Sequence, residues 1–379
     1  MKLLKGNNIL SRVQCDVLRG IAITGIFLHN FCHWLKGANE ENEYLFNQER
    51  ADNMWNYWTS GNIDQFFPIQ FFSFFGHYGV PLFLFLSGFG LVMKYEKAGG
   101  GHLKALSFVG YHWLKLFRLM ILGYLLSILV YALCGFGFHP WNEILAQLAM
   151  VVNAVFINSG SALSPGPYWF FGLMFEVYIL YIVFLYPTRD KGCWRWLVPV
   201  LLIVLAFSLQ LPLQQHSTVL NYFRYNVVVA LMPLSVGIML ARYGLPQVPR
   251  WCWALIAFLG LGLLAVFSMD YVLWLWSPLV VIVGAVAFVK SIPSGAAILK
   301  PMAWMGMMSS FIFVVHSIPR IPMFKFWLWK QPALMTSYYL WLLAYIVLTL
   351  VLAWLYKKYL TLIPSPRLNN NGSISFSRK

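Results

Sequence analysis

Long apolar runs separated by short polar loops dominate this sequence. Helices need about 20 apolar residues to cross the hydrocarbon core of a bilayer. Runs of that length occur ten times, at about residues 17–35, 66–93, 108–134, 168–187, 194–212, 222–242, 251–268, 271–290, 304–326 and 337–357. The pattern predicts an all-α, polytopic integral membrane protein with about ten transmembrane helices.

An eleventh apolar segment, Trp141 to Asn158, is interrupted by Glu143, Gln147 and Asn153. With ten spans and a cytoplasmic N-terminus, 21 of the 27 Lys and Arg residues lie on the cytoplasmic side, as the positive-inside rule requires. An extra span here would move basic loops to the opposite side. We therefore predict that 141–158 is a re-entrant or interfacial helix and that both termini are cytoplasmic.

Composition supports this class. The 379-residue chain is 60% hydrophobic and 10% charged, outside the range of soluble domains. Its net charge of +15 comes from short loops between apolar runs, which argues against a nucleic-acid-binding face. We predict one transmembrane domain over 1–363 and a disordered cytoplasmic tail over 364–379, because the tail is polar.

The first span carries a stripe of polar side chains. At about 100° per residue, Asp16, Arg19, His29, Asn30 and His33 share one helix face. Ionisable groups are costly inside a bilayer and usually face a protein interior or an aqueous cavity. The stripe predicts that this helix forms the wall of an internal reaction or transport cavity.

Histidine in such a cavity suits general-base chemistry, because its ordinary pKa is near neutral. His29 is the first candidate, and a histidine that only bonds a neighbouring helix is the structural alternative. His29 and His33, at i and i+4, could also ligate a metal. No glutamate of an HExxH motif accompanies them, so we predict no metal.

Cationic and mid-span polar residues add further candidates. Lys115 and Arg118, at i and i+3, share a face that suits phosphate groups, with anchoring to lipid headgroups as the alternative. Glu176 lies mid-span and should be protonated or paired. His316 is expected to line the cavity or to bond at a helix interface.

Five segments together resemble the membrane-bound acyltransferase-3 family, over about residues 10 to 360. In the family's order they are D-x-L-R-G…H (Asp16, Arg19, Gly20, His29), F-x-F-L-S-G-F (Phe83 to Phe89), a basic pair with a tyrosine (Lys115, Arg118, Tyr124), Y-W-F…E-x-Y (Tyr168, Trp169, Glu176, Tyr178) and S-x-x-x-x-x-H (Ser310, His316). The Arg-to-His spacing is one residue shorter than the commonest family pattern, which keeps His33 open as an alternative base.

The resemblance implies a ten-helix O-acyltransferase. It would move an acetyl or other short acyl group from cytoplasmic acyl-CoA to a hydroxyl of a cell-surface glycan or lipid-linked sugar. We expect catalytic roles for His29, Asp16 and Glu176. We expect donor binding by Arg19, Lys115, Arg118, Ser87 and Tyr124. We expect acceptor binding by Asn30, His33, Trp169, Tyr178 and His316.

The expected partners follow from the same assignment: acyl-CoA as donor substrate, no permanent cofactor, no nucleic acid, and a bacterial cytoplasmic membrane as location, with a homodimer left open. A transporter or flippase of an anionic lipid-linked sugar could use the same polar cavity. A scaffold for glycan assembly is a third alternative, which would tolerate loss of His29.

Overall fold

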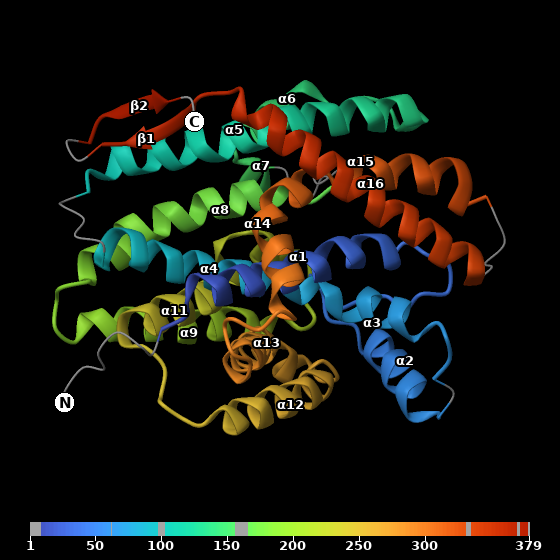
Figure 1. Cartoon of the computed structure of the whole chain (residues 1–379), viewed down its shortest axis with the longest axis horizontal. Helices are drawn as coiled ribbons and strands as arrows, with labels where there is room; N and C mark the ends of the chain where they lie inside the picture. The colour runs from blue at the N-terminus through green and yellow to red at the C-terminus, as the bar shows by residue number, and fades with distance from the viewer. Residues whose placement is uncertain are drawn as a thin grey trace.

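The structure is a computed structural model of the chain that describes residues 9–61, 63–97, 103–155, 166–330, 335–369 and 372–377. It is almost entirely helical (Figure 1). In chain order the α-helices are α1 (Arg12–Cys32), α2 (Gln48–Thr59), α3 (Phe67–Phe75), α4 (Gly79–Val92), α5 (Ala105–Tyr131), α6 (Trp141–Leu148), α7 (Val152–Val155), α8 (Trp169–Leu180), α9 (Trp194–Gln210), α10 (Ser217–Tyr225), α11 (Val227–Tyr243), α12 (Arg250–Phe267), α13 (Tyr271–Ser291), α14 (Leu299–Val315), α15 (Ser317–Met323) and α16 (Met335–Thr361).

Among the described residues, seven helical segments are long and apolar enough to cross a membrane, and two bent helix pairs raise that number to nine. The bent pairs are α10 with α11 and α14 with α15 and its continuation. The 21-residue α1 falls outside this set because polar side chains interrupt it. With α1 included, these segments coincide with the ten predicted spans. The prediction of an all-α polytopic membrane protein is confirmed.

The lipid-facing surface is visible in the outer helices. On α12, Phe258 is 74% exposed and Leu261 is 66% exposed, although both side chains are strongly apolar. Leu340 and Leu343 of α16 are exposed as well. Such surfaces are stable in contact with hydrocarbon but not with water.

Two short helices occupy the segment predicted to be re-entrant or interfacial. α6 has eight residues and α7 has four, and both are too short to cross a bilayer. The buried side chain of Asn153 on α7 donates hydrogen bonds to the carbonyls of Trp169 and Tyr225, at 2.8 and 2.7 Å. α7 is therefore fastened inside the bundle, and residues 156–158 of the predicted segment lie outside the described residues.

The tail differs from its prediction. Residues Ser365–Leu368 (β1) and Ile374–Ser377 (β2) form an antiparallel hairpin instead of a disordered segment. The hairpin lies along α5 (Figure 1). Polar composition alone suggested disorder, but paired backbone groups and this contact with α5 order the hairpin.

α1 lies at the centre of the bundle, packed against α14, α4, α3 and α13 (Figure 1). A side chain at Gly306 would overlap the carbonyl oxygen of Asp16, so glycine is required where α14 crosses α1. Phe27 and Phe31, on the apolar face of α1, pack on Tyr345 of α16. These contacts hold α1 in place, which fixes the positions of its polar residues.

A buried ion pair joins α11 to the π-helical turn after α4, Met93–Lys97. Arg242 donates to both carboxylate oxygens of Glu96, each at 2.9 Å, and its side chain is fully buried. The same guanidinium donates to the carbonyls of Leu185 and Arg195. Paired in this way, both charges are satisfied inside the protein.

Candidate active site

Three cavities lie in series along α1. The first, about 270 Å³, is lined by His29 and is called here the histidine cavity. The second, about 210 Å³, is the middle cavity, and it shares Phe170 and Phe313 with the first. The third, about 250 Å³, is the lysine cavity, lined by Lys94 and Lys115. Arg19, Phe83, Ser87 and Tyr178 line both the middle and the lysine cavity.

The last turn of α1 places His29 in the histidine cavity. Its side chain is 3% exposed. Gly76 lies against the Cβ of His29, where a larger residue would collide, so the chain before α4 can approach α1 closely. Asn30 and His33 line the same cavity, as the polar stripe predicts.

Backbone carbonyls fix the protonation of the His29 ring. Nδ1 lies 2.9 Å from the carbonyl oxygen of Ser73 and 3.2 Å from that of Phe72. Carbonyl oxygens only accept, so Nδ1 carries the hydrogen and donates it. In the neutral ring Nε2 is then the unprotonated nitrogen, and among the described residues it has no hydrogen-bond partner. This is the arrangement that a general base needs.

Glu43 is the acidic group nearest to that nitrogen. Its Oε2 lies 3.6 Å from His29 Nε2, and its side chain is 16% exposed. A carboxylate at this distance stabilises the imidazolium that forms when His29 accepts a proton. Glu43 belongs to the loop between α1 and α2.

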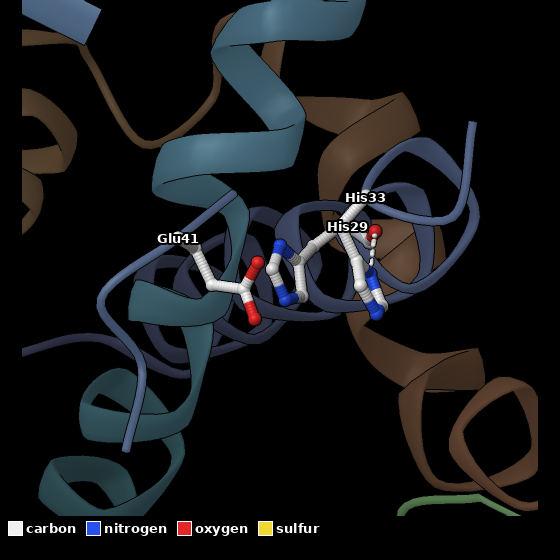
Figure 2. Close-up of side chains that lie close together, drawn as sticks. All are labelled: His29, His33 and Glu41. Carbon is white, nitrogen blue, oxygen red and sulfur yellow. Dashed lines mark hydrogen bonds between the residues drawn. The ribbon is translucent and has the colours of Figure 1, made fainter. Parts of the chain in front are cut away.

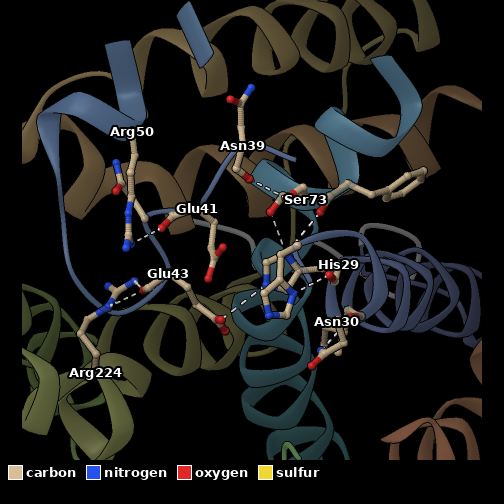
Figure 3. A network of polar contacts seen from close by, with 12 residues as sticks. His29, Asn30, Asn39, Glu41, Glu43, Arg50, Ser73 and Arg224 are labelled. Atoms are coloured by element: carbon tan, nitrogen blue, oxygen red, sulfur yellow. Dashed lines mark hydrogen bonds and ion pairs between the residues drawn. The ribbon is translucent and has the colours of Figure 1, made fainter. Parts of the chain in front are cut away.

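That loop folds back over the bundle, and side chains of the bundle and of α2 hold it through hydrogen bonds to its backbone carbonyls (Figure 3). Three consecutive carbonyls each accept a side-chain hydrogen bond: Glu41 from Arg50 at 2.9 Å, Asn42 from Trp274 at 2.7 Å, and Glu43 from Arg224 at 2.7 Å. These bonds leave the carboxylates of Glu41 and Glu43 free to face the cavity. Burial raises the pKa of the Glu41 carboxyl.

Arg320 of α15 brings a positive charge to the histidine cavity. Its Nη1 donates to the backbone carbonyl of Asn30 at 2.7 Å and to Asn30 Oδ1 at 2.8 Å. The guanidinium lies 4.0 Å from the ring centre of Trp34. Within the described part of the chain, Arg320 forms no ion pair with a carboxylate. A buried guanidinium of this kind is suited to an anionic group or a developing oxyanion.

The lysine cavity gathers cations from three elements. Arg19 of α1 is oriented by Asp16, whose Oδ1 accepts from Nη1 at 2.8 Å. Lys94 and Lys115 line the same cavity. Side chains of this charge and flexibility bind phosphate groups.

The middle cavity is mainly aromatic and aliphatic. Phe170 and Phe313 separate it from the histidine cavity, with ring centres 5.2 Å apart. Ser309 and Ser310 add hydroxyl groups to its wall. These two aromatic side chains therefore form an apolar wall between the middle cavity and the histidine cavity.

Two predicted catalytic residues, Asp16 and Glu176, do not line the histidine cavity. Asp16 lies 13 residues earlier on α1, about 20 Å along the axis, and pairs with Arg19. Glu176 accepts a 2.6 Å hydrogen bond from the backbone nitrogen of Val227, the first residue of α11. This hydrogen bond satisfies an otherwise free helix N–H.

The predicted basic pair is also divided. Lys115 lines the lysine cavity, whereas Arg118 donates to the carbonyls of Leu360 and Ile363 at the end of α16. Arg118 therefore caps a helix C-terminus instead of facing the cavity.

Of four other predicted site residues, two line a cavity and two do not. Trp169 lines the histidine cavity, and Tyr178 lines the other two. Tyr124 is buried against Tyr168, outside the lining of these three cavities. His316 is fully buried at the bend between α14 and α15, where Nδ1 lies 2.9 Å from the carbonyl of Phe313. It therefore bonds within its own helix, and it does not line the three cavities.

Sequence reasoning missed Glu41, Glu43, His77, Lys94 and Arg320, all of which line a cavity. The two glutamates lie in a loop, where no periodicity shows which way a side chain points. Arg320 lies near the end of the predicted span 304–326, among the six basic residues that the ten-span topology places on the outer side. A basic residue after H-S-I-P in an apolar segment was the available clue.

Comparison with known proteins identifies the family of this chain. A family model described as an acyltransferase domain matches residues 12–358, which is most of the chain. No curated protein and no solved structure matches the chain significantly. The match covers α1, the three cavities and all but the last turn of α16. The chain belongs to the acyltransferase 3 family, and it is a multi-pass membrane acyltransferase.

Proposed function

We propose that the protein transfers an acetyl or another short acyl group from cytoplasmic acyl-CoA to a hydroxyl of a glycan or lipid-linked sugar on the other side of the membrane. The row of three cavities is the observation that carries this proposal. The row begins at a cationic end and finishes at a buried base, with the apolar wall of Phe170 and Phe313 before the last cavity. Arg19 and His29 are ten residues apart on one helix, about 15 Å along its axis.

The donor enters at the lysine cavity. Arg19, Lys94 and Lys115 neutralise the phosphates of CoA, and the flexible pantetheine arm extends through the middle cavity past Tyr178. The thioester then lies near Phe170 and Phe313, at the boundary with the histidine cavity. This places the acyl carbon within reach of an acceptor bound on the other side.

The acceptor hydroxyl binds beside His29 Nε2. His29 takes the hydroxyl proton while the oxygen attacks the thioester carbonyl. The tetrahedral intermediate then expels the CoA thiolate, which recovers the proton from the imidazolium. Glu43 stabilises the imidazolium, and Arg320 supplies positive charge to the oxyanion. His33 lies one turn further along α1 and contacts the acceptor.

Two histidine variants test this assignment. Inside-out vesicles receive labelled acetyl-CoA, and labelled acceptor is measured. His29→Gln should lower transfer by about 10² to 10⁴, the usual effect of removing a general base. His33→Gln should have a smaller effect. An inactive His33→Gln beside an active His29→Gln would assign the base to His33, and full activity in both would exclude acid–base chemistry on α1.

The same vesicles separate the enzyme from the transporter alternative. Acetylated product that requires acetyl-CoA supports the acyltransferase. Unmodified lipid-linked sugar that crosses the membrane without acetyl-CoA supports the transporter. Membership in an acyltransferase family favours the first outcome.

A further inference from the structure

A second kind of site overlaps the histidine cavity. One possible ligand atom each from His29, His33 and Glu41 lies within 4.8 Å of the others. Figure 2 shows the Glu41 carboxylate beside the His29 ring, with the His33 ring on the other side of it. The two rings stack, with centres 4.6 Å apart.

Both imidazoles are prepared as metal ligands. His33 Nδ1 donates to the carbonyl of His29 at 2.7 Å, just as His29 Nδ1 donates to that of Ser73. Metal-binding histidines almost always donate their second ring nitrogen to a carbonyl, a carboxylate or water. The backbone thus holds both rings in the tautomer whose Nε2 can bind a metal. His29 Nε2 is buried and without a partner among the described residues.

We propose that His29, His33 and Glu41 bind one Zn²⁺-class divalent transition metal. Two imidazoles and one carboxylate form a donor set that Zn²⁺ prefers. Within the described residues, the Glu41 carboxylate forms no ion pair, and Glu43, 3.6 Å from His29 Nε2, is available as a fourth ligand. Arg320 lines the cavity and opposes a cation, but the two carboxylates outweigh its single charge.

The site requires a modest closure. Ligand atoms of a tetrahedral zinc are about 3.3 Å apart, given bonds of about 2.0–2.1 Å. His29 is fixed by burial and by its carbonyl partners. His33 and Glu41 are partly exposed, so the His33 ring can tilt about its bond to the His29 carbonyl and the Glu41 side chain can rotate. Movement of those two side chains completes the coordination without movement of α1.

A bound metal has a chemical consequence, which rests on the proposed function. Metal coordination uses the same Nε2 lone pair that accepts the acceptor proton. The metal-bound protein therefore cannot use His29 as a base, and Zn²⁺ on this side of the membrane inhibits transfer. The carboxylate ligand comes from Glu41 of the loop between α1 and α2, and not from a residue on α1.

Binding is tested without any substrate. Detergent-solubilised protein is dialysed against Zn²⁺, and bound metal is counted. Co²⁺ then replaces it, and the absorption spectrum reports tetrahedral coordination. We expect one metal per chain and about 100-fold weaker binding in Glu41→Gln and in His33→Ala, but no change in the control His216→Ala, whose side chain is exposed elsewhere. Equal binding by all four proteins would overturn the site.

Inhibition is tested separately, with labelled acetyl-CoA and acceptor. Zn²⁺ should abolish transfer by the unmodified protein, a chelator should restore it, and the residual activity of Glu41→Gln should resist about 100-fold more Zn²⁺. If metal binds but does not inhibit transfer, the metal site is supported and the base role of His29 is refuted. Absence of binding beside a base-dependent transfer would refute the metal site alone.

Discussion

Replacement of Glu43 by glutamine tests the electrostatics of the proposed base. The change removes one negative charge 3.6 Å from His29 Nε2 and keeps the size of the side chain. The loop should keep its position, because Arg224 binds the backbone carbonyl of Glu43 and not its carboxylate. Any loss of rate therefore reports the charge.

The magnitude follows from Coulomb's law. At 3.6 Å, the attraction between carboxylate and imidazolium is about 4.6 kcal/mol for an effective dielectric constant of about 20, and about 1.2 kcal/mol in bulk water. Each 1.36 kcal/mol of barrier is tenfold in rate, so the limits are about 2,400-fold and about 7-fold. Because both side chains are largely buried, we expect a fall in kcat of about 100-fold.

The assay measures acetyl transfer at saturating donor and acceptor, with Glu49→Gln as the matched control. Glu49 lies exposed in the first turn of α2, so its loss should leave the rate unchanged. A wild-type kcat in Glu43→Gln would refute the stabilisation of an imidazolium. A change confined to the KM of the acceptor would assign Glu43 to binding.

Three further predictions follow from the positions of single side chains. Lys115→Ala should raise the KM for acyl-CoA by about 10- to 100-fold. Arg118→Ala should leave that KM unchanged and lower thermal stability, because Arg118 caps α16. Equal effects of the two variants on KM would contradict the assignment of Lys115 to donor binding and of Arg118 to helix capping. Glu96→Gln should destabilise the protein by about 3–5 kcal/mol, because Arg242 stays buried without its partner. Thermal unfolding in detergent measures that loss, and Arg242→Met added to it should recover part of the stability. Phe313→Ala should raise hydrolysis of acyl-CoA relative to transfer, because it opens the wall between two cavities to water; an unchanged ratio would show that Phe313 is no barrier.

The membrane fold and the polar face of α1 were predictable because both depend on periodicity. A bilayer requires long apolar helices, and the 3.6-residue repeat fixes which side chains share a face. His29, Asn30 and His33 therefore line the histidine cavity, as predicted, and Arg19 lines the other two. These positions need no knowledge of the neighbouring helices.

Partners across the bundle could not be predicted in this way. Glu176 and Arg118 both looked suited to chemistry, but each bonds the end of another helix, α11 or α16. The unpaired backbone groups at a helix end and the polar groups of a ligand both form hydrogen bonds with polar side chains. The packing of the helices decides whether such a side chain bonds a helix end or faces a cavity. The fold of the loop that carries Glu43 depends on Arg224 and Trp274, which lie far along the chain.

The backbone, more than any side-chain triad, determines what His29 can do. Carbonyls of Phe72 and Ser73 occupy Nδ1, so Glu43 approaches Nε2, the same nitrogen that meets the acceptor. A carboxylate at Nδ1 would orient the ring but would be separated from the reacting proton by the imidazole. Here orientation comes from uncharged carbonyls, and the charge lies beside the transferred proton. That division of roles leaves Nε2 open to a proton or to a metal ion, and it makes the two mutually exclusive.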